Sequence, residues 1–257
     1  MDSRPSTLLD LLTRRTSVLR ELNNDPVRKR DLAARLDVSR STVDRALREL
    51  ATQDLVERTD DGYRTTLAGR LTLDAFDHLQ ERTRGIDAAL DVLTVLPHDA
   101  PFPPDLFAGA TVVRPSPIAP HRPAETNAQL LSWADNVNGL ISAVSEQYVD
   151  NYRDAIDGGT SVQMVFPSAV LERLVSEYGT ADDPVFHRDI VEVRQTSETL
   201  PCSVKLHERD GEQVASLTVY GPDGLRGLVT NDSPEAVSWT ASFIDRHWDA
   251  ADPLPSP

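Results

Sequence analysis

The feature that most constrains this chain is the segment from Arg28 to Arg58, which reads RKRDLAARLDVSRSTVDRALRELATQDLVER. Its first part carries a short apolar face at Leu32, Ala33 and Leu36. A second apolar set follows at the i, i+3, i+4 and i+7 spacing of a helix, made by Val43, Ala46, Leu47 and Leu50. Only Asp37-Val38-Ser39 separates the two, and Ser39 is a favourable N-cap. The pattern predicts two helices joined by a tight turn.

The second helix, expected from about Arg40 to Thr52, has a polar face opposite its apolar one. Arginine can pair bidentately with guanine, and Ser and Thr hydroxyls bond phosphates or bases. The residues that we expect to contact DNA from this helix and its cap are Ser39, Arg40, Ser41, Thr42, Arg45 and Arg48. Three basic residues ahead of the first helix, Arg28, Lys29 and Arg30, would contact phosphates.

A β-hairpin is expected after the second helix. Leu55 and Val56 begin a strand, Asp61-Gly62 is a two-residue turn signal, and Tyr63 to Thr65 forms the return strand. Arg58 and Arg64 would flank the tip and follow the DNA backbone. With a preceding helix over about Ser6–Asn24, the order predicts a winged helix. The alternative is an ordinary helix pair with a solvated arginine face, but the very short turn and the hairpin favour DNA binding.

Charge is distributed unevenly along the 257 residues. Residues 1–66 hold 13 Lys+Arg and 12 Asp+Glu, whereas residues 67–257 hold 13 and 29. Only Lys29 and Lys205 are lysines. Acidic, lysine-poor composition is typical of salt-loaded cytoplasm, where a Debye length of about 3 Å at 1 M salt would screen repulsion from DNA. We therefore expect a halophilic, archaeal, cytoplasmic protein, and neither a signal-peptide pattern nor a membrane-length apolar run is evident.

The expected fold class is mixed α/β. Residues 1–66 would form the winged helix-turn-helix domain, residues 67–96 a connecting helix that can also mediate dimerisation, and residues 97–257 an α/β sensor or oligomerisation domain. Pro97 to Pro123 contains 8 of the 18 prolines and should be mostly extended. Helices are then expected over residues 124–137, 146–156, 168–178 and 234–248, and strands over 140–144, 161–166, 191–195, 203–208, 213–220 and 227–230.

Three segments of the second part carry a family resemblance: GATVVRPSPIAPHRP from Gly109, VSEQYVDNYRDAIDGGTSVQMVFP from Val144 and SPEAVSWTASFIDRHW from Ser233. With them the chain resembles archaeal winged-helix regulators that contain the middle domain of the methanogenesis regulatory protein, over about residues 10–250. The resemblance implies a transcription regulator with a C-terminal sensing or oligomerisation domain. The same half is similar to phospholipase D-like sensor domains, although the catalytic His-x-Lys-Asp signature of the enzymes is absent.

The pattern of reactive residues does not favour an enzyme. A phosphate-binding loop, a nucleophile elbow and metal-ligand spacing among the six histidines are all missing, so no cofactor or metal is expected. Cys202, the one cysteine, is interpreted as a small buried hydrophobe. An anionic effector could instead be held in the rigid proline-rich segment, by Arg114, Ser116, His121 and Arg122, with Tyr148 nearby. The alternative is that Arg114 pairs with a local carboxylate.

The sequence thus supports a DNA-binding transcriptional regulator, expected as a homodimer on double-stranded DNA. Two alternatives remain open. One is a winged helix that binds another protein rather than DNA, which would not need the Arg40, Arg45 and Arg48 face. The other is a degenerate phospholipase-like enzyme, which the missing catalytic motif opposes.

Overall fold

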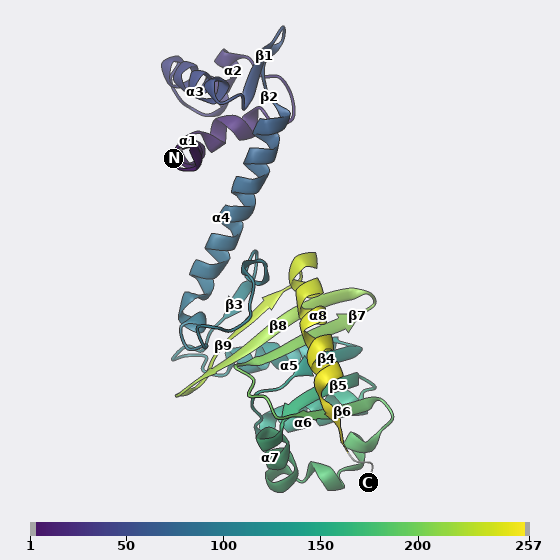
Figure 1. Ribbon diagram of the computed structural model, residues 1–257. Coiled ribbons are helices and arrows are strands. Elements are labelled where there is room, and N and C mark those ends of the chain that lie inside the picture. The colour runs from purple at the N-terminus through teal and green to yellow at the C-terminus, as the bar shows by residue number, and fades with distance from the viewer. Residues whose placement is uncertain (1–3, 255–257) are drawn as a thin grey trace. The chain divides into compact units, whose positions relative to one another are not determined.

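The computed structural model describes residues 4–254, which fall into two compact units that divide between Glu81 and Arg82. Figure 1 labels the elements of each unit. The N-terminal unit contains three helices, a two-stranded hairpin and the first half of a fourth helix. These elements are α1 (Arg4–Glu21), α2 (Lys29–Arg35), α3 (Arg40–Thr52), β1 (Val56–Thr59), β2 (Gly62–Thr65) and α4 (Leu67–Leu93). The expected winged helix-turn-helix is therefore confirmed, and mixed α/β is the fold class of the chain.

The N-terminal core is built from the apolar stripes that the sequence predicts. Leu11, Leu12, Leu19 and Leu22 of the α1 segment are buried together with the inner face of α3. Leu32 of α2 joins them, while Ala33 and Leu36 pack at the edge of the core. The spacing of apolar residues on these helices thus places each helix correctly.

The hairpin turn lies one residue earlier than predicted. Strand β1 ends at Thr59, which pairs with Gly62, so Asp60 and Asp61 form the turn and Gly62 is the first residue of β2. Gly62 has φ +146°, and a Cβ there would lie 2.5 Å from the Val27 carbonyl oxygen. The glycine is required because the backbone before α2 runs beside β2, where Val27 forms a bridge with Tyr63.

Helix α4 is one continuous helix, and its two halves serve different cores. Leu73 and Phe76 are buried in the N-terminal core, whereas Ala89 and Val92 are buried in the C-terminal core. The boundary between the units therefore lies inside α4 rather than at the helix ends, near residues 66 and 96, where the sequence placed it. Gly85 does not interrupt the helix. The position requires glycine because a Cβ there would lie 1.8 Å from the Phe107 carbonyl oxygen.

The C-terminal unit is built on an eight-stranded mixed sheet with the order β10-β6-β5-β4-β7-β8-β9-β3. Strands β6, β5 and β4 are parallel to one another, and every other neighbouring pair is antiparallel. The strands are β3 (Thr111–Val113), β4 (Asn136–Leu140), β5 (Ser161–Pro167), β6 (Val191–Thr196), β7 (Ser203–Arg209), β8 (Glu212–Gly221), β9 (Gly224–Asn231) and β10 (Asp252–Pro253).

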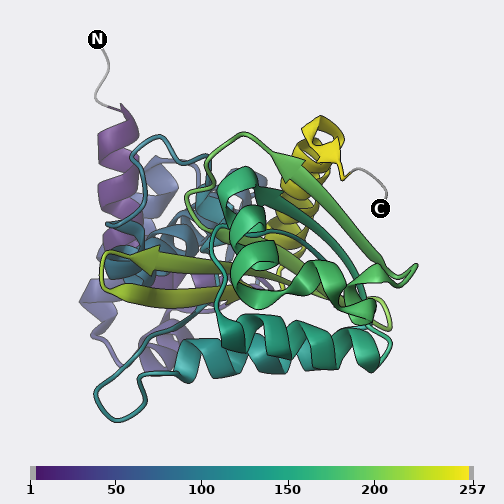
Figure 2. The ribbon, with the colours of Figure 1, turned by 90° about the horizontal axis from the view of Figure 1, so that it is seen from below.

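Helices cover both faces of this sheet, as Figures 1 and 2 show. Helix α8 lies on one side with the short 3₁₀ segment η1 and the last turns of α4, over an apolar core. Helices α5, α6 and α7 lie on the other side, over a second core. Their bounds are η1 (Pro104–Leu106), α5 (Arg122–Trp133), α6 (Glu146–Asp157), α7 (Ser168–Tyr178), η2 (Thr180–Asp182), η3 (Pro184–His187) and α8 (Pro234–Ala250). No helix in residues 4–254 is long and apolar enough to cross a membrane.

Local signals place most of these elements, and β4 is the main error. The helix expected to reach Val137 ends at Trp133, and the strand expected over residues 140–144 is Asn136–Leu140. Asn136, Asn138 and Gly139 form strands poorly by themselves. They are held here by pairing with β5 on one side and β7 on the other. The proline-rich segment, predicted to be mostly extended, is mostly irregular, with η1 and β3 within it and α5 beginning at Arg122.

Replacing Gly85 with alanine should destabilise the C-terminal unit. Helix propensity alone would favour alanine by about 1 kcal/mol. The added Cβ would collide with the Phe107 backbone, which cannot move aside as a flexible side chain could, and we expect a net loss of about 2 kcal/mol. Thermal unfolding of the Gly85→Ala variant measures this. Asp87→Ala, at an exposed position of the same helix, is the control and should unfold like the wild type; an unchanged Gly85→Ala protein would contradict the close approach.

Candidate nucleic-acid interface and buried polar cluster

The turn between α2 and α3 is fixed by three local features. Asp37 has φ +51°, in the left-handed region, and reverses the chain after α2. The Val38 N–H donates to the Ala33 carbonyl oxygen at 3.1 Å and closes the end of that helix. The Ser39 hydroxyl accepts from the Thr42 N–H at 3.1 Å, which confirms the predicted N-cap of α3. The start of α3 is therefore held in one orientation.

Helix α3 has one buried face and one exposed face. Val43, Ala46, Leu47 and Leu50 are at most 2% exposed. The opposite side presents side chains that are exposed to solvent, namely Arg40, Ser41, Thr42, Arg45 and Arg48. The hydroxyls of Ser41 and Thr42 each lie 2.8 Å from that of Ser39, so the three form one cluster at the helix start. This face combines hydroxyls and guanidinium groups, the groups that contact phosphates and base edges.

The basic residues predicted to contact DNA differ in their partners. Within residues 4–254, four of them form no ion pair with a carboxylate: Arg28, Arg40, Arg48 and Arg58. The others are paired: Lys29 with Asp44, Arg30 with Asp31, Arg45 with Glu49, and Arg64 with Glu57. The unpaired guanidinium groups can approach a phosphate without first breaking an ion pair.

Glu49 is the most strongly held carboxylate of this surface. Arg15 donates to it from α1 at 2.9 Å, and Arg45 donates to its other oxygen at 2.9 Å. These hydrogen bonds lower the pKa of Glu49 to about 2, with that of Arg15 first and that of Arg45 second. Glu49 therefore stays ionised at neutral pH. It restrains Arg45 along the helix, although the Arg45 side chain remains 73% exposed.

Within residues 4–254 the hairpin presents one unpaired arginine, Arg58 of β1, and an acidic tip. Glu57 and Arg64 face each other across the strands, with the ion pair at 2.7 Å, and Arg58 pairs in register with Tyr63. The ammonium group of Lys29 lies 5.5 Å from the centre of the Tyr63 ring. The turn residues Asp60 and Asp61 are exposed and carry two negative charges at the tip. Contact with a phosphate backbone is thus favoured along Arg58 and disfavoured at the tip.

The residues predicted to form an effector site do not share one environment: some are bonded or buried within the chain, and others are exposed. Arg114 forms a bidentate pair with Asp91, at 2.8 and 2.6 Å, and also donates to the Ala88 carbonyl oxygen. Ser116 is engaged in a local turn with Ala119. His121 and Arg122 are exposed at the start of α5. The hydroxyl of Tyr148 is buried. The guanidinium of Arg114 is therefore already neutralised by a carboxylate of the chain.

Sequence reasoning missed a buried polar cluster around Lys205, on the sheet face covered by α5 and α6. Lys205 is 1% exposed, and its ammonium group donates to the Asn127 side-chain oxygen. It lies 5.7 Å from the centre of the Tyr148 ring. His207, two residues further along β7, is fully buried and bonds the Ser216 hydroxyl at 3.1 Å. The alternation of β7 puts Lys205 and His207 on one face, but no sequence pattern shows that α5 and α6 bury that face.

Burial controls the protonation of this cluster. It lowers the pKa of Lys205 to about 7, because the charged ammonium loses its water shell. The pKa of His207 is lowered by its own burial first, and then by the charge on Lys205. Burial also raises the pKa of the Tyr152 hydroxyl and that of the Cys202 thiol, the latter to about 12, which agrees with Cys202 as a buried hydrophobe.

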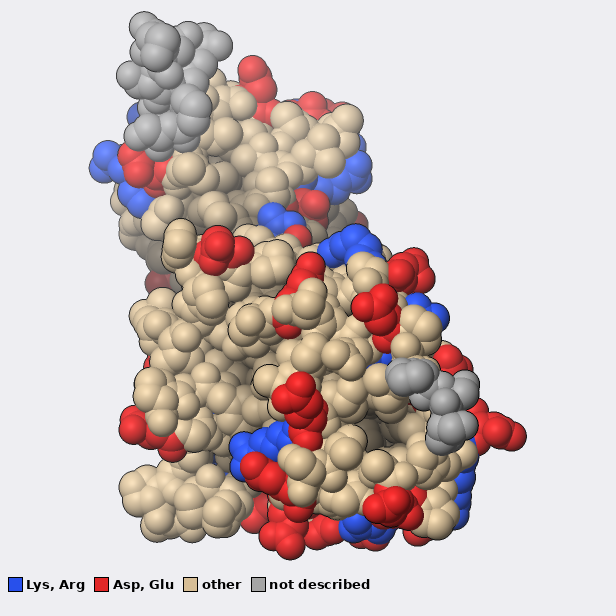
Figure 3. All heavy atoms as spheres, turned by 60° about the horizontal axis from the view of Figure 1, so that its bottom comes forward, with Lys and Arg blue, Asp and Glu red and all other residues tan. Residues whose placement is uncertain are grey.

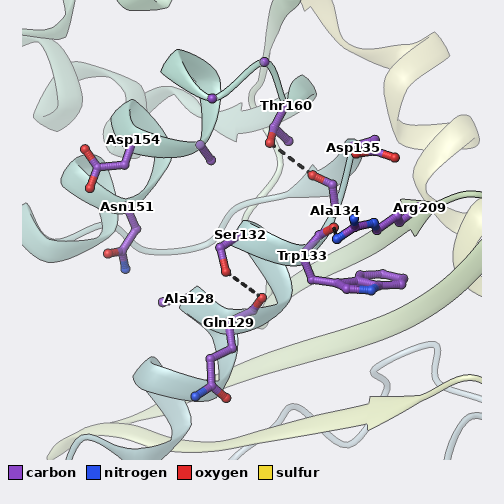
Figure 4. A pocket seen from close by; sticks show the side chains of 13 residues that line it. Ala128, Gln129, Ser132, Trp133, Ala134, Asp135, Asn151, Asp154, Thr160 and Arg209 are labelled. Carbon is purple, nitrogen blue, oxygen red and sulfur yellow. Dashed lines mark hydrogen bonds between the residues drawn. The ribbon is translucent and has the colours of Figure 1, made fainter.

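A hollow of about 600 Å³ opens between the end of α5 and α6 (Figure 4). Some of its polar groups are bonded within the chain. The Thr160 hydroxyl donates to the Ala134 carbonyl oxygen at 3.0 Å, and the Ser132 hydroxyl donates to that of Gln129 at 3.0 Å. Arg209 donates to the Trp133 carbonyl oxygen at 3.3 Å. The side chains of Gln129, Asp135 and Asp154 also line the hollow, and none of them forms a hydrogen bond or ion pair within residues 4–254.

The comparisons with known proteins identify the family. The model of the middle domain of the methanogenesis regulatory protein FilR1 matches residues 120–250. That match spans half of the chain, and the chain belongs to this family of regulatory proteins, as the resemblance in its sequence predicted. The model of the HVO_A0261 N-terminal domain matches residues 6–88. No curated protein matches the chain.

Several solved structures are similar to the chain at low identity. The archaeal chromatin protein TrmBL2, described with a novel mode of DNA binding, is 15% identical, with 97% of this chain and 99% of that one covered and a TM-score of 0.42. Polyphosphate kinase from Porphyromonas gingivalis is 10% identical over 73% of this chain and 26% of that one, with a TM-score of 0.40. The hypothetical protein SSo2273 from Sulfolobus solfataricus is 16% identical over 42% and 73%, with a TM-score of 0.22. These values support no functional conclusion.

Neutralising the acidic tip should strengthen binding to DNA at low salt. In Asp60→Asn/Asp61→Asn the repulsion between the tip and phosphates is removed, and we expect a three- to tenfold gain in affinity at roughly 0.1–0.2 M salt. The gain should vanish above about 1 M salt, where screening is nearly complete. Fluorescence anisotropy with a labelled duplex measures both. The control is Asp189→Asn/Asp223→Asn, which removes two exposed carboxylates from the other unit. Equal gains in DNA affinity in the two variants would rule out a specific role for the tip.

Proposed function

We propose that this protein is a transcriptional regulator that binds double-stranded DNA through its N-terminal unit. The observation that carries the proposal is the exposed face of α3, where a cluster of hydroxyls and unpaired guanidinium groups lies opposite a fully buried face. A helix of this kind, held at a fixed angle by the preceding helix and turn, is the element that enters the major groove in helix-turn-helix proteins. Arg28 and Arg58, which line one hollow beside the hairpin, support the proposal as phosphate contacts.

The competing function is a winged helix that binds another protein. The exposed side of α3 argues against it, because Arg40, Arg45 and Arg48 are exposed and no large apolar side chain of that helix is. Protein-binding surfaces bury an apolar centre. Membership of a regulatory family also favours a DNA reader. In the N-terminal unit the exposed leucines lie instead on α1 and α4, outside this face.

The decisive variant is Arg45→Ala/Arg48→Ala. Each bidentate arginine–base contact contributes about 1–3 kcal/mol of discrimination, so losing two should weaken specific binding at least about 30-fold. Fluorescence anisotropy in near-molar KCl measures the DNA affinity of the wild type and of the double variant. The duplex is the promoter region upstream of the protein's own gene, or one selected from genomic DNA. Circular dichroism should show an unchanged fold, because neither side chain belongs to the core.

Arg173→Ala is the matched control for that experiment, since it removes an exposed arginine of α7 in the other unit. It should bind DNA like the wild type. Unchanged affinity of a folded Arg45→Ala/Arg48→Ala protein for its operator would refute α3 as the recognition helix. Absence of any duplex bound by the wild type would favour the protein-binding alternative.

The protein is proposed to act as a homodimer that joins through α4. Leu67 and Leu71, one helical turn apart, are 63% and 58% exposed. Exposed leucines on one stripe are costly to leave in water and suit a second copy of the same helix. A two-fold pair would place two recognition helices on two half-sites. Sensing by the C-terminal unit would then alter the spacing of these helices.

Dimerisation is tested by Leu67→Glu/Leu71→Glu. Size-exclusion chromatography with light scattering should give twice the chain mass for the wild type and one chain mass for the variant, because four buried carboxylates, two from each chain, would face one another. Val175→Glu, at an exposed apolar position of α7, should remain dimeric. A wild-type monomer at micromolar concentration, or a dimeric double variant, would exclude this helix as the interface.

A further inference from the structure

The DNA face, by which we mean the exposed side of α3 with the start of α2 and the hairpin, carries carboxylates as well as cations. Lys29, the first residue of α2, donates to Asp44 and so joins that helix to α3. Arg64 of β2 donates to Glu57 of β1 at 2.7 Å. The four side chains are between 45% and 56% exposed, so both solvent ions and a DNA phosphate can reach them.

Each of these two carboxylates has a single ion-pair partner. Within residues 4–254, Asp44 is paired with Lys29 alone and Glu57 with Arg64 alone. A phosphate that draws Lys29 or Arg64 to itself therefore leaves a carboxylate with no counter-charge beside a polyanion. Like charges at such short range repel, and a cation taken up from solution removes the repulsion. Binding of DNA at either pair thus exchanges one counter-charge of the carboxylate for another.

Glu49 of the same face is held differently, because it has two partners. Arg15 of α1 donates to one of its oxygens at 2.9 Å, and Arg45 donates to the other at 2.9 Å. The side chain of Arg15 is only 16% exposed and faces the interior of the unit, whereas that of Arg45 is 73% exposed. When Arg45 turns to DNA, Arg15 stays with Glu49. This carboxylate therefore needs no cation from solution.

These differences fix the number of ions that move on binding. An unpaired cation releases about 0.9 counterion from duplex DNA for each phosphate that it neutralises, and this release makes affinity fall as salt rises. Within residues 4–254 the cations of this kind on the face are Arg28, Arg40, Arg48 and Arg58. Lys29 and Arg64 release the same counterions, but Asp44 and Glu57 take up about one cation each, so the two contributions nearly cancel.

We propose that DNA binding by this face takes up solution cations at Asp44 and Glu57, so that its affinity depends much less on salt than its number of basic residues implies. The near balance of 13 Lys+Arg and 12 Asp+Glu in residues 1–66 agrees with this. The consequence is a complex that persists in concentrated salt. The inference rests on the proposed function and describes how salt acts on it.

The test is the slope of log K against log [KCl], measured by fluorescence anisotropy with full-length protein and a duplex selected from genomic DNA. The decisive variant is Asp44→Asn/Glu57→Gln, which removes both carboxylates and keeps the side-chain sizes and every basic residue. Its slope should be more negative than that of the wild type by about 2 for each N-terminal unit on the duplex. It should bind roughly tenfold more tightly than the wild type near 0.2 M KCl, and this advantage should shrink as KCl rises.

Two single variants are the controls. Glu49→Gln also removes a carboxylate that pairs with a DNA-facing arginine, but its slope should stay close to that of the wild type, because Arg15 already neutralises Glu49 in the complex. Glu177→Gln removes the partner of Arg173 in the other unit and should match the wild type in both affinity and slope. Replacing chloride by glutamate at equal K⁺ should leave the difference between the wild type and the double variant unchanged, because the exchanged ions are cations.

The possible failures are distinguishable. Equal slopes for the wild type and Asp44→Asn/Glu57→Gln would overturn this inference and leave DNA binding by α3 standing. A slope that steepens as much in Glu49→Gln, per carboxylate removed, would also overturn it, since any lost negative charge would then have the same effect. A wild type that binds no duplex at any salt concentration would overturn both this inference and the proposed function.

Discussion

The burial of one side of α3 is the interaction on which the N-terminal unit depends. Four apolar side chains of this helix pack against α1 and α2, and each of the three larger ones, Val43, Leu47 and Leu50, contributes about 1.5–3 kcal/mol of transfer free energy for its removal from water. The exposed ion pairs on the other side contribute much less, since surface pairs are typically worth 0–1 kcal/mol. The core therefore decides how α3 is rotated, and the outward arginines follow from that rotation. The packing of the inner side therefore determines which side chains of α3 face outward, and Ser39 fixes where the helix begins.

The C-terminal unit distributes its polarity in an unusual way. One face of its sheet packs an apolar core under α8, whereas the other buries Lys205, His207, Ser216 and Thr218 on β7 and β8. Acidic side chains are scattered over the face of the molecule seen in Figure 3, but none of them forms an ion pair with Lys205 within the described chain. A lysine that is buried without a carboxylate lowers stability, and replacing such groups by apolar residues is often stabilising.

Local signals in the sequence predicted most of the elements. The errors share one physical cause, which is contact between segments that lie far apart in the sequence. The cap at Ser39 was predicted correctly, and it depends on neighbouring residues only, as do the cap at Ser233 and the left-handed Gly179 after α7. Gly62 was assigned to the turn, but it is required by the approach of Val27, and the polar strand β4 forms only because β5 and β7 flank it. The alternative considered for Arg114, a local carboxylate, matches its pairing with Asp91, 23 residues away. Which face of β7 is buried depends on α5 and α6, so the cluster around Lys205 could not be predicted from sequence alone.

Amide hydrogen exchange of the full chain, with and without a duplex selected from genomic DNA in near-molar KCl, tests the central claim most directly. A DNA-reading α3 predicts that the duplex slows exchange at the start of that helix, over residues 39–45, and along the hairpin strand that carries Arg58. The C-terminal sheet should be affected much less. Slowed exchange confined to the C-terminal unit, or a bound duplex that leaves α3 and the hairpin unchanged, would contradict the account.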